Sequence, residues 1–268
     1  MKFIPLLQPK SLILAAFVAG TPIAIGVVAT LTGLAATPAV AIDVIDFGQK
    51  WVVSVDEARA LIANGALVLD ARNADLKAAS PIQNARPIRW QDLSNTSGRI
   101  STDNAAISLR LQALGVDAGR PIVVLADPFQ GLGEDAEIVW ALRSLGHDRV
   151  VMVDGGLPAL LAAGVPQVQP PLGQGSFIVD HRDDWSVDAN AVSRDLVQLD
   201  ARSMSELLAD DGRLKPLPEI AAWLAAKGID HDTALATESA WLTAVLIDAG
   251  YHARQVVGAS EYALTAAN

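Results

Sequence analysis

The stretch that decides the fold is Ala141-Leu142-Arg143-Ser144-Leu145-Gly146-His147, continued by Val150-Val151-Met152-Val153-Asp154-Gly155-Gly156-Leu157-Pro158. A helical apolar pattern ends at a glycine, a run of four apolar residues follows, and a Gly-Gly pair makes the next turn. Short apolar runs bounded by turn residues are typical of buried parallel strands. The stretch therefore predicts one helix–strand–turn–helix unit of an α/β protein.

The same alternation of helix and strand continues on both sides of this stretch. Ser54 and Glu57 form a capping box, which predicts a helix that stops near Gly65. Further helices are expected at 105–114, 134–145 and 158–163, and strands at 66–69, 122–125 and 150–153. Strands that alternate with helices predict a central parallel sheet with helices on both faces.

The tetrapeptide Leu-Asp-Ala-Arg occurs twice, at 69–72 and at 199–202, each time after an apolar run. The second occurrence leads into expected helices at 203–208, 218–226 and 239–249 and strands at 234–236 and 254–257. This repetition predicts two copies of one unit, at 50–165 and 193–268, joined by a Pro- and Gly-rich linker at 166–192. The second copy is the reduced one, because its Asp-to-glycine span, Asp200 to Gly258, is shorter than Asp70 to Gly155.

Composition excludes several classes of function. The 268 residues include 20 Lys and Arg against 30 Asp and Glu, for a net charge of -10, so a nucleic-acid partner is not expected. The chain has no cysteine, which excludes disulfides, thiolate metal sites and thiol redox motifs. Its four histidines show no helical i, i+4 spacing, so we expect neither a metal site nor a cofactor.

Residues 1–41 are expected to direct the chain to a membrane. Lys2 and Lys10 are the only charged residues before Ile42, and Ala39-Val40-Ala41 fits a signal cleavage site between Ala41 and Ile42. The uncharged run Ser11–Leu34 would extend roughly 36 Å as a helix, beyond the hydrocarbon core of about 30 Å.

Two interpretations of this segment stay open. We expect residues 11–34 to be retained as an anchor, with the two lysines in the cytoplasm and the acidic remainder at the periplasmic or lumenal face. The alternative is a cleaved signal peptide and a soluble periplasmic protein.

The repeated pattern resembles the tandem rhodanese-like family, to which thiosulfate and mercaptopyruvate sulfurtransferases belong. The resemblance is carried by Val68–Arg72, Pro121–Leu125 and Ala141–Pro158 in the first copy, and more weakly by Leu199–Ser203 and Gly258–Tyr262 in the second. It implies two α/β domains with central parallel sheets, the second reduced. The family transfers sulfur through a persulfide on a cysteine thiolate.

The resemblance also implies where that cysteine would lie. It would follow the strand at 122–125, at Ala126 or Asp127, and in the second copy it would lie near Thr237. The first loop reads Asp127-Pro128-Phe129-Gln130-Gly131, followed by acidic Glu134 and Asp135 at the next helix. An anionic sulfur needs backbone N–H groups and a free helix N-terminus, whereas this loop offers carboxylates and a proline. Sulfurtransferase activity is therefore not expected.

Other residues invite a structural and a functional interpretation. Asp70 with Arg72, and Asp200 with Arg202, are expected to brace strand ends, although they could line a pocket. Gly155-Gly156 is expected to make a tight turn and not a phosphate site. Trp51 and Trp185 lie in irregular stretches where exposed anchor roles are open.

These patterns predict a non-catalytic rhodanese-like protein that acts as a binding or structural accessory subunit. Its partners are expected to be proteins of a membrane complex, such as a photosynthetic or respiratory one. The alternative is a ligand-binding sensor, or an enzyme that uses the former rhodanese pocket without a cysteine. An open pocket beside Asp127 would favour the alternative, and a pocket filled by Phe129 would favour the accessory subunit.

Overall fold

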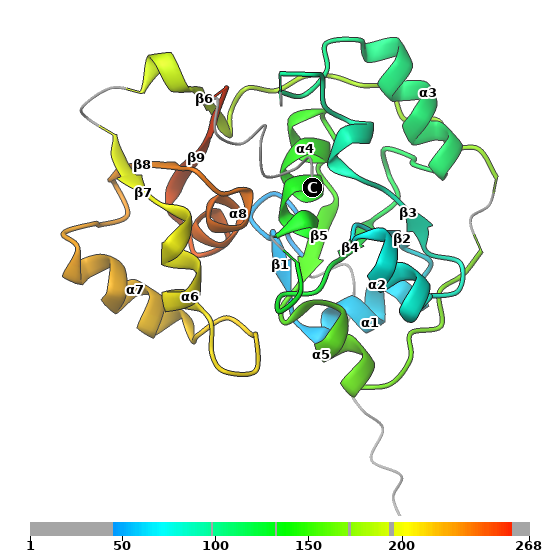
Figure 1. Ribbon diagram of the computed structural model, residues 1–268, viewed down its shortest axis with the longest axis horizontal. Helices are drawn as coiled ribbons and strands as arrows, with labels where there is room; N and C mark the ends of the chain where they lie inside the picture. The colour runs from blue at the N-terminus through cyan, green and yellow to red at the C-terminus, as the bar shows by residue number, and fades with distance from the viewer. Residues whose placement is uncertain (1–44, 98, 132, 171–172, 193–195, 259–268) are drawn as a thin grey trace, which may run out of the picture. The chain divides into compact units, whose positions relative to one another are not determined.

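The computed structural model describes residues 45–97, 99–131, 133–170, 173–192 and 196–258 (Figure 1). Two parallel β-sheets flanked by helices make up this part of the chain, as the sequence predicts. The predicted anchor at 11–34 and the cleavage position at Ala41 and Ile42 lie outside it. Within the described ranges, no helix has both the length and the apolarity needed to cross a membrane.

The first sheet has five strands in the spatial order β1-β5-β4-β2-β3. The strands are β1 (Val52–Val53), β2 (Leu67–Asp70), β3 (Arg86–Pro87), β4 (Ile122–Leu125) and β5 (Val150–Val153). The accompanying helices are α1 (Val55–Ala63), α2 (Ala74–Ala79), η2 (Trp90–Asp92), α3 (Asn104–Leu114), α4 (Glu134–Ser144) and α5 (Gly156–Ala162).

The second sheet has four strands in the order β6-β9-β8-β7. The strands are β6 (Ser186–Asp188), β7 (Val197–Leu199), β8 (Ala234–Thr237) and β9 (His252–Val257). The accompanying helices are η3 (Ala189–Ala191), η4 (Ala201–Ser203), α6 (Met204–Leu207), α7 (Leu217–Ala226) and α8 (Ala240–Asp248).

The second sheet repeats the order of the first with β3 left out, so that β6, β9, β8 and β7 correspond to β1, β5, β4 and β2. Both copies of Leu-Asp-Ala-Arg lie at the ends of corresponding strands, β2 and β7. An isolated antiparallel bridge follows each copy, Ser94 with Ile100 and Leu208 with Leu214. Between tetrapeptide and bridge the second copy has no counterpart of α2 and β3, which accounts for most of its shorter length.

Local signals explain where the main helices begin. In the capping box of α1, Ser54 Oγ accepts the Glu57 N–H at 3.2 Å and Glu57 Oε2 accepts the Ser54 N–H at 2.7 Å. Ser239 caps α8 through the Leu242 N–H. α5 begins at Gly156, two residues before the predicted start, because the Gly-Gly turn passes directly into the helix.

Six short elements of the described chain have no counterpart among the sequence predictions, namely β1, α2, β3, η2, β6 and η3. The three strands have two or three residues each, too few for an apolar period to be visible. β6 lies inside the stretch 166–192 that the sequence assigns to a linker, so the second sheet takes its first strand from that stretch.

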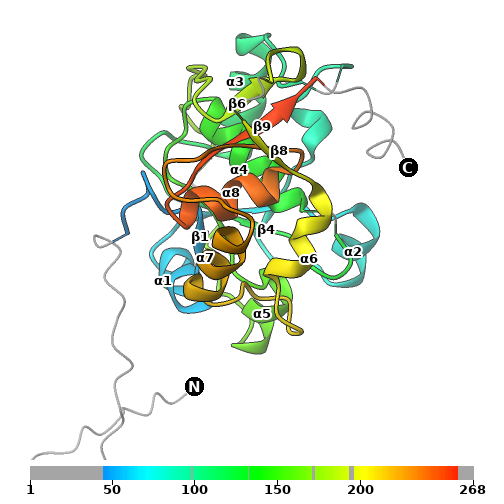
Figure 2. The same cartoon turned by 90° about the vertical axis from the view of Figure 1, so that its left-hand side faces the viewer.

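One hydrophobic core runs through both sheets. α4 packs on β4 and β5, α8 packs on β8 and β9, and the two helices pack on each other between the sheets (Figures 1 and 2). α8 is buried from Ala240 to Leu246. A second cluster fills the other face of the first sheet, under α1 and α5.

The tryptophans confirm how far this core extends. Trp51 is fully buried, stacked edge-on against Trp185 with ring centroids 5.4 Å apart, and Arg143 lies over its ring. Trp185 is partly buried against the same core. An exposed anchor role for Trp51 is therefore wrong, because this side chain is fully buried, whereas Trp185 packs against it and stays partly exposed.

Candidate functional site

The first strand-to-helix loop, Ala126–Gly133, is closed by its own carboxylate. Asp127 Oδ1 accepts the backbone N–H groups of Phe129 at 2.9 Å and Gln130 at 3.1 Å, and the Asp127 carbonyl accepts the Gly131 N–H at 2.8 Å. Successive backbone N–H groups in such a turn are what a loop offers to a bound anion. In this loop an internal carboxylate already holds two of them.

The Gly155-Gly156 turn lies against the start of the same loop. The carbonyl of buried Ala126 accepts the Leu157 N–H at 2.8 Å. A Cβ on Gly156 would lie 2.6 Å from that carbonyl oxygen and 2.8 Å from Pro128 Cδ, and the φ of Gly156 is +59°. The two glycines thus allow the close approach of backbones that the predicted tight turn requires.

The corresponding loop of the second copy is almost absent. Eight residues separate β4 from α4, whereas only Glu238 and Ser239 separate β8 from α8. Thr237 is fully buried, its hydroxyl donates to the Ser239 carbonyl at 3.0 Å, and it is hydrogen-bonded to the Thr243 hydroxyl. Any nucleophile at Thr237 would be enclosed in the core.

A cavity opens beside the first loop, with an empty volume of about 470 Å³ that includes its opening to solvent. We call it the Asp127 cavity; its walls include Asp127, Asp135, Asp154, Met152, Met204 and Trp241. Phe129 is 60% exposed, lies beside Gly212 and is not among the lining residues. The position beside Asp127 is therefore an open pocket that Phe129 does not fill.

The Asp127 cavity has an acidic wall at the N-terminus of α4. Asp135 is 7% exposed, and burial raises its pKa to about 7, with a further contribution from the charge of Glu134. Glu137, on the same helix but not among the residues that line the cavity, also has its pKa raised to about 7 by burial, helped by Glu134 and Asp135. Across the cavity, burial raises the pKa of Asp154, although it accepts the Leu214 N–H at 2.7 Å. Where these carboxyl groups are ionised, such a wall disfavours a bound anion.

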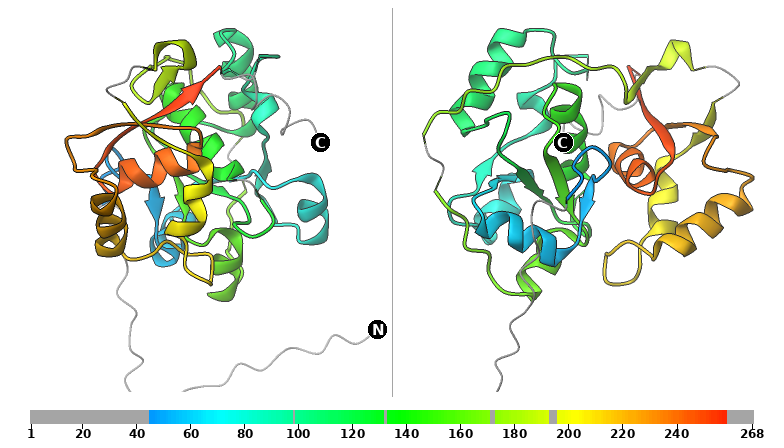
Figure 3. Two further views of the ribbon diagram at one scale, coloured as in Figure 1. Left: turned by 60° about the vertical axis from the view of Figure 1, so that its left-hand side comes forward. Right: turned by 180° about the vertical axis from the view of Figure 1, so that it is seen from behind.

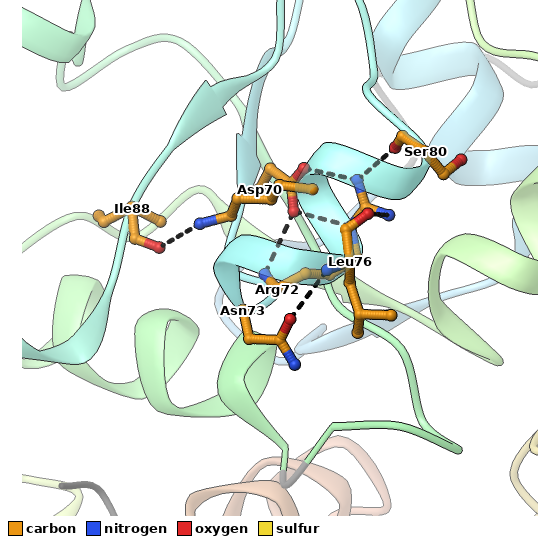
Figure 4. Close-up of polar contacts among 7 residues, drawn as sticks. Asp70, Arg72, Asn73, Leu76, Ser80 and Ile88 are labelled. Carbon is orange, nitrogen blue, oxygen red and sulfur yellow. Dashed lines mark hydrogen bonds and ion pairs between the residues drawn. The ribbon is translucent and has the colours of Figure 1, made fainter. Parts of the chain in front are cut away.

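Asp70 and Arg72 form a buried brace at the end of β2 (Figure 4). Arg72 Nε and a terminal guanidinium nitrogen donate to the two carboxylate oxygens at 3.0 and 2.8 Å. The guanidinium also donates to the carbonyls of Leu76 and Ser80, which ties α2 to the strand. Arg72 is 3% exposed and is not among the residues that line the Asp127 cavity, and its contacts are those of a brace.

Asp200 and Arg202 occupy the equivalent place at the end of β7 without forming an equivalent brace. Their closest contact is 3.5 Å, and the Arg202 side chain is 94% exposed. Asp200 and Arg202 therefore form an exposed ion pair and not a buried brace. The physical reason is that the second copy has no counterpart of α2 and β3 to cover it.

Sequence reasoning named lining residues of the first loop, including Asp127, Pro128 and Gly131, as well as Asp135 and the Gly155-Gly156 turn, but it missed the walls formed by Met152, Asp154, Met204 and Trp241. Asp154 carried a usable signal, because it follows β5 and ligands of parallel sheets gather at the carboxyl ends of strands. Met204 and Trp241 belong to the second copy. No sequence signal brings them to the first loop, since this depends on how α4 and α8 pack.

Comparison with known proteins agrees with this architecture. A model of the rhodanese-like domain matches residues 54–163. The chain is similar in structure to the 3-mercaptopyruvate sulfurtransferase SseA from Escherichia coli, with a TM-score of 0.62, 18% identity and coverage of 77% of this chain and 97% of that one. Comparison with curated protein sequences gives no match.

Two further solved structures share the fold. The 3-mercaptopyruvate sulfurtransferase from Leishmania major gives a TM-score of 0.62 at 18% identity, over 80% of this chain and 74% of that one. The sub-stoichiometric sulfur transferase subunit of yeast mitochondrial complex I gives 0.58 at 15%, over 77% and 94%. Residues 54–163 therefore form a rhodanese-like domain, and the chain that contains this domain has no cysteine.

Proposed function

We propose that this chain is a tandem rhodanese-like protein without sulfurtransferase chemistry, and that it acts as a binding or structural accessory subunit. The closure of the first loop on Asp127 carries the proposal, because it fills the backbone cradle that an anionic sulfur would need. The lack of any thiol in the sequence and the enclosure of Thr237 support it.

The partner in this proposal is a membrane complex, with the chain held at its periplasmic or lumenal face by residues 11–34. The uncharged run Ser11–Leu34 supports an anchor, and the two preceding lysines support this orientation. A structurally similar protein is described as a subunit of yeast mitochondrial complex I, which supports a respiratory complex as one candidate. A photosynthetic complex is the other.

The test has a chemical and an assembly arm. Recombinant full-length protein should show no turnover above a buffer blank with thiosulfate and cyanide or with 3-mercaptopyruvate. Native protein extracted from membranes in mild detergent should migrate in size-exclusion chromatography with a larger complex, and intact-mass measurement should find Met1 or the next residue at its start. Clear turnover would overturn the chemical part, and migration as a free monomer would overturn the assembly part.

A second function is favoured by one observation, the open Asp127 cavity with its buried carboxylate Asp135. Buried titratable groups in a cavity are common at ligand-binding and catalytic sites. In this alternative, which is compatible with a membrane location, the chain is a ligand-binding sensor or an enzyme that uses the former rhodanese pocket.

A further inference from the structure

The Asp127 cavity holds an excess of negative charge that its own walls do not neutralise. Three aspartates line it, Asp127, Asp135 and Asp154, and no Lys, Arg or His is among its described lining residues. Asp127 and Asp154 each accept backbone N–H groups from their surroundings. Asp135 is more than nine-tenths buried, and the donors to it are the backbone N–H groups of Ala136 and of Asp135 itself.

The charged neighbours of Asp135 on α4 are also carboxylates and further disfavour its ionised form. The charge that acts on it most strongly is that of Glu134, also a carboxylate, and Glu137 follows one turn along α4. The positive end of the α4 dipole offsets only about half a charge. The side chain of Arg213 lies beside Gly155 and its charge lowers the pKa of Asp154, but Arg213 is not itself among the residues that line the cavity. A proton neutralises Asp135 below about pH 7, and a positive ligand would compensate its charge above that pH.

The remaining walls suit an organic cation. Trp241 contributes an aromatic surface, and its Cβ lies 3.2 Å from where a Cβ on Gly133 would be, so it is held at the entrance to α4. Met152 and Met204 contribute polarisable sulfur, and the Ser239 hydroxyl donates to Met204 Sδ at 3.4 Å. Tryptophan attracts ammonium and guanidinium groups through its ring face.

We propose that the Asp127 cavity binds a small organic cation, with a primary ammonium or guanidinium group between the Asp135 carboxylate and Trp241. This proposal rests on the ligand-binding alternative and names its ligand class. A divalent metal fits less well, since the described residues contain no group of three or more His, Asp or Glu side chains placed to hold one. An anion is disfavoured by the three carboxylates.

The binding test uses full-length protein and three probes of similar size, propylammonium, propanol and propionate. The tryptophan side-chain N–H signals are followed by NMR, with Trp241 assigned from Trp241→Phe. Propylammonium should shift the Trp241 signal with a Kd on the order of 1 mM, a strength reachable by a ligand of few heavy atoms. Propanol and propionate should shift it at least tenfold more weakly.

Two matched substitutions locate the charge. Asp135→Asn should weaken propylammonium binding at least tenfold. Glu137→Gln removes a carboxylate of similar pKa from the same helix, outside the cavity lining, and should change the Kd by less than about twofold. Equal losses of propylammonium affinity in both variants would show that binding depends on the general negative charge of α4, and would overturn the proposed site at Asp135.

The pH dependence adds an independent readout. The charged groups around Asp135 are Glu134 and Glu137 on α4, Asp127 on the loop, Asp154 after β5 and Arg213 beyond it. With the pKa of Asp135 at about 7, the ionised fraction grows about tenfold between pH 6 and pH 8. Propylammonium affinity should rise by about that factor, and a flat profile would contradict the proposal.

The outcomes separate this inference from the functions on which it rests. Stronger binding of propanol or propionate would overturn the cation class and keep a ligand site. No shift of Trp241 with any probe would overturn both the site and the ligand-binding alternative. Neither result touches the accessory-subunit proposal, which the membrane extraction tests separately.

Discussion

Asp127 places a carboxylate at the base of the loop between β4 and α4. Its carboxylate is held by the N–H groups of Phe129 and Gln130. Replacing one side chain in this loop leaves the acidic wall of α4 in place. The loop is therefore held closed by its own hydrogen bonds. A thiol introduced by a single substitution should not give sulfurtransferase activity.

We predict that Ala126→Cys and Asp127→Cys both lack sulfurtransferase activity. At position 126 the thiol would be buried, since Ala126 is, and at 127 it would face Asp135 and Asp154, which disfavour a thiolate. Steady-state assays with thiosulfate and cyanide measure this, with a cysteine-dependent rhodanese as positive control. A rate near that of the control enzyme would show that the acidic wall does not matter.

Asp135→Asn should stabilise the protein, and more so at high pH. Burial raises the pKa of Asp135 to about 7 in the folded chain, above its ordinary value of 3.8, so the folded state binds the proton more tightly. The stabilising protonation is complete below about pH 3.8 and is lost as the pH rises through about 7, which leaves an ionised, buried carboxylate above it.

The melting temperature of Asp135→Asn should exceed that of the unmodified chain by several degrees at pH 8 and by clearly less at pH 5. Asp75→Asn, in the exposed first turn of α2, is the control and should show no such pH-dependent gain. A gain in melting temperature over the unmodified chain that is smaller at pH 8 than at pH 5 would contradict the predicted direction of the pKa shift of Asp135.

The ends of β2 and β7 show how one tetrapeptide takes two structures. Arg72 is enclosed by α2 and bonded to Asp70, Leu76 and Ser80, whereas Arg202 projects into solvent. β2 lies between β4 and β3, while β7 forms an edge of its sheet. The covering elements, and not the tetrapeptide, decide whether the ion pair is buried.

Arg72→Ala and Arg202→Ala therefore make a matched pair. Arg72→Ala leaves Asp70 buried without its partner and should lower the free energy of unfolding by about 3–5 kcal/mol. Arg202→Ala should produce no measurable change, because the pair it breaks is exposed. Urea unfolding followed by circular dichroism measures both, and similar losses in the two variants would be inconsistent with the geometry.

The elements that could be predicted from sequence are those with their own pattern. β4 and β5 are continuous apolar runs, and α1 carries its capping box. β1, β3 and β6 could not be predicted, because two or three residues become a strand only through a neighbouring strand. For the site, the absence of a thiol and the acidic loop were visible in sequence. The cavity walls from Met204 and Trp241 depend on tertiary packing and were not.

The two sheets, from β1 to β9, share one hydrophobic core. The core is continuous through α4 and α8. At the end of α8, Asp248 accepts the backbone N–H groups of Trp51 at 2.6 Å and Val52 at 2.9 Å, and β1 lies beside α8 when the chain is seen from behind (Figure 3). A helix of the second copy thus completes the edge of the first sheet.

We predict a single unfolding transition for both sheets. Hydrogen exchange followed by mass spectrometry should give β4 and β8 the same opening free energy, since neither sheet keeps its core without the other. Asp248→Ala should lower the stability of peptides from both sheets together. Earlier exchange of β8 with β4 still protected would mean that the second copy unfolds by itself.

The packing of α8 against α4 has a consequence during synthesis. α4 ends at Ser144 and α8 begins at Ala240, so α8, which covers α4 in the folded protein, is synthesised about a hundred residues later. At a synthesis rate of about 5–20 residues per second, the apolar face of α4 stays uncovered for roughly 5–20 s. In that interval the nascent chain is a natural client for chaperones, and a chain terminated before α8 is left with an uncovered face that favours aggregation.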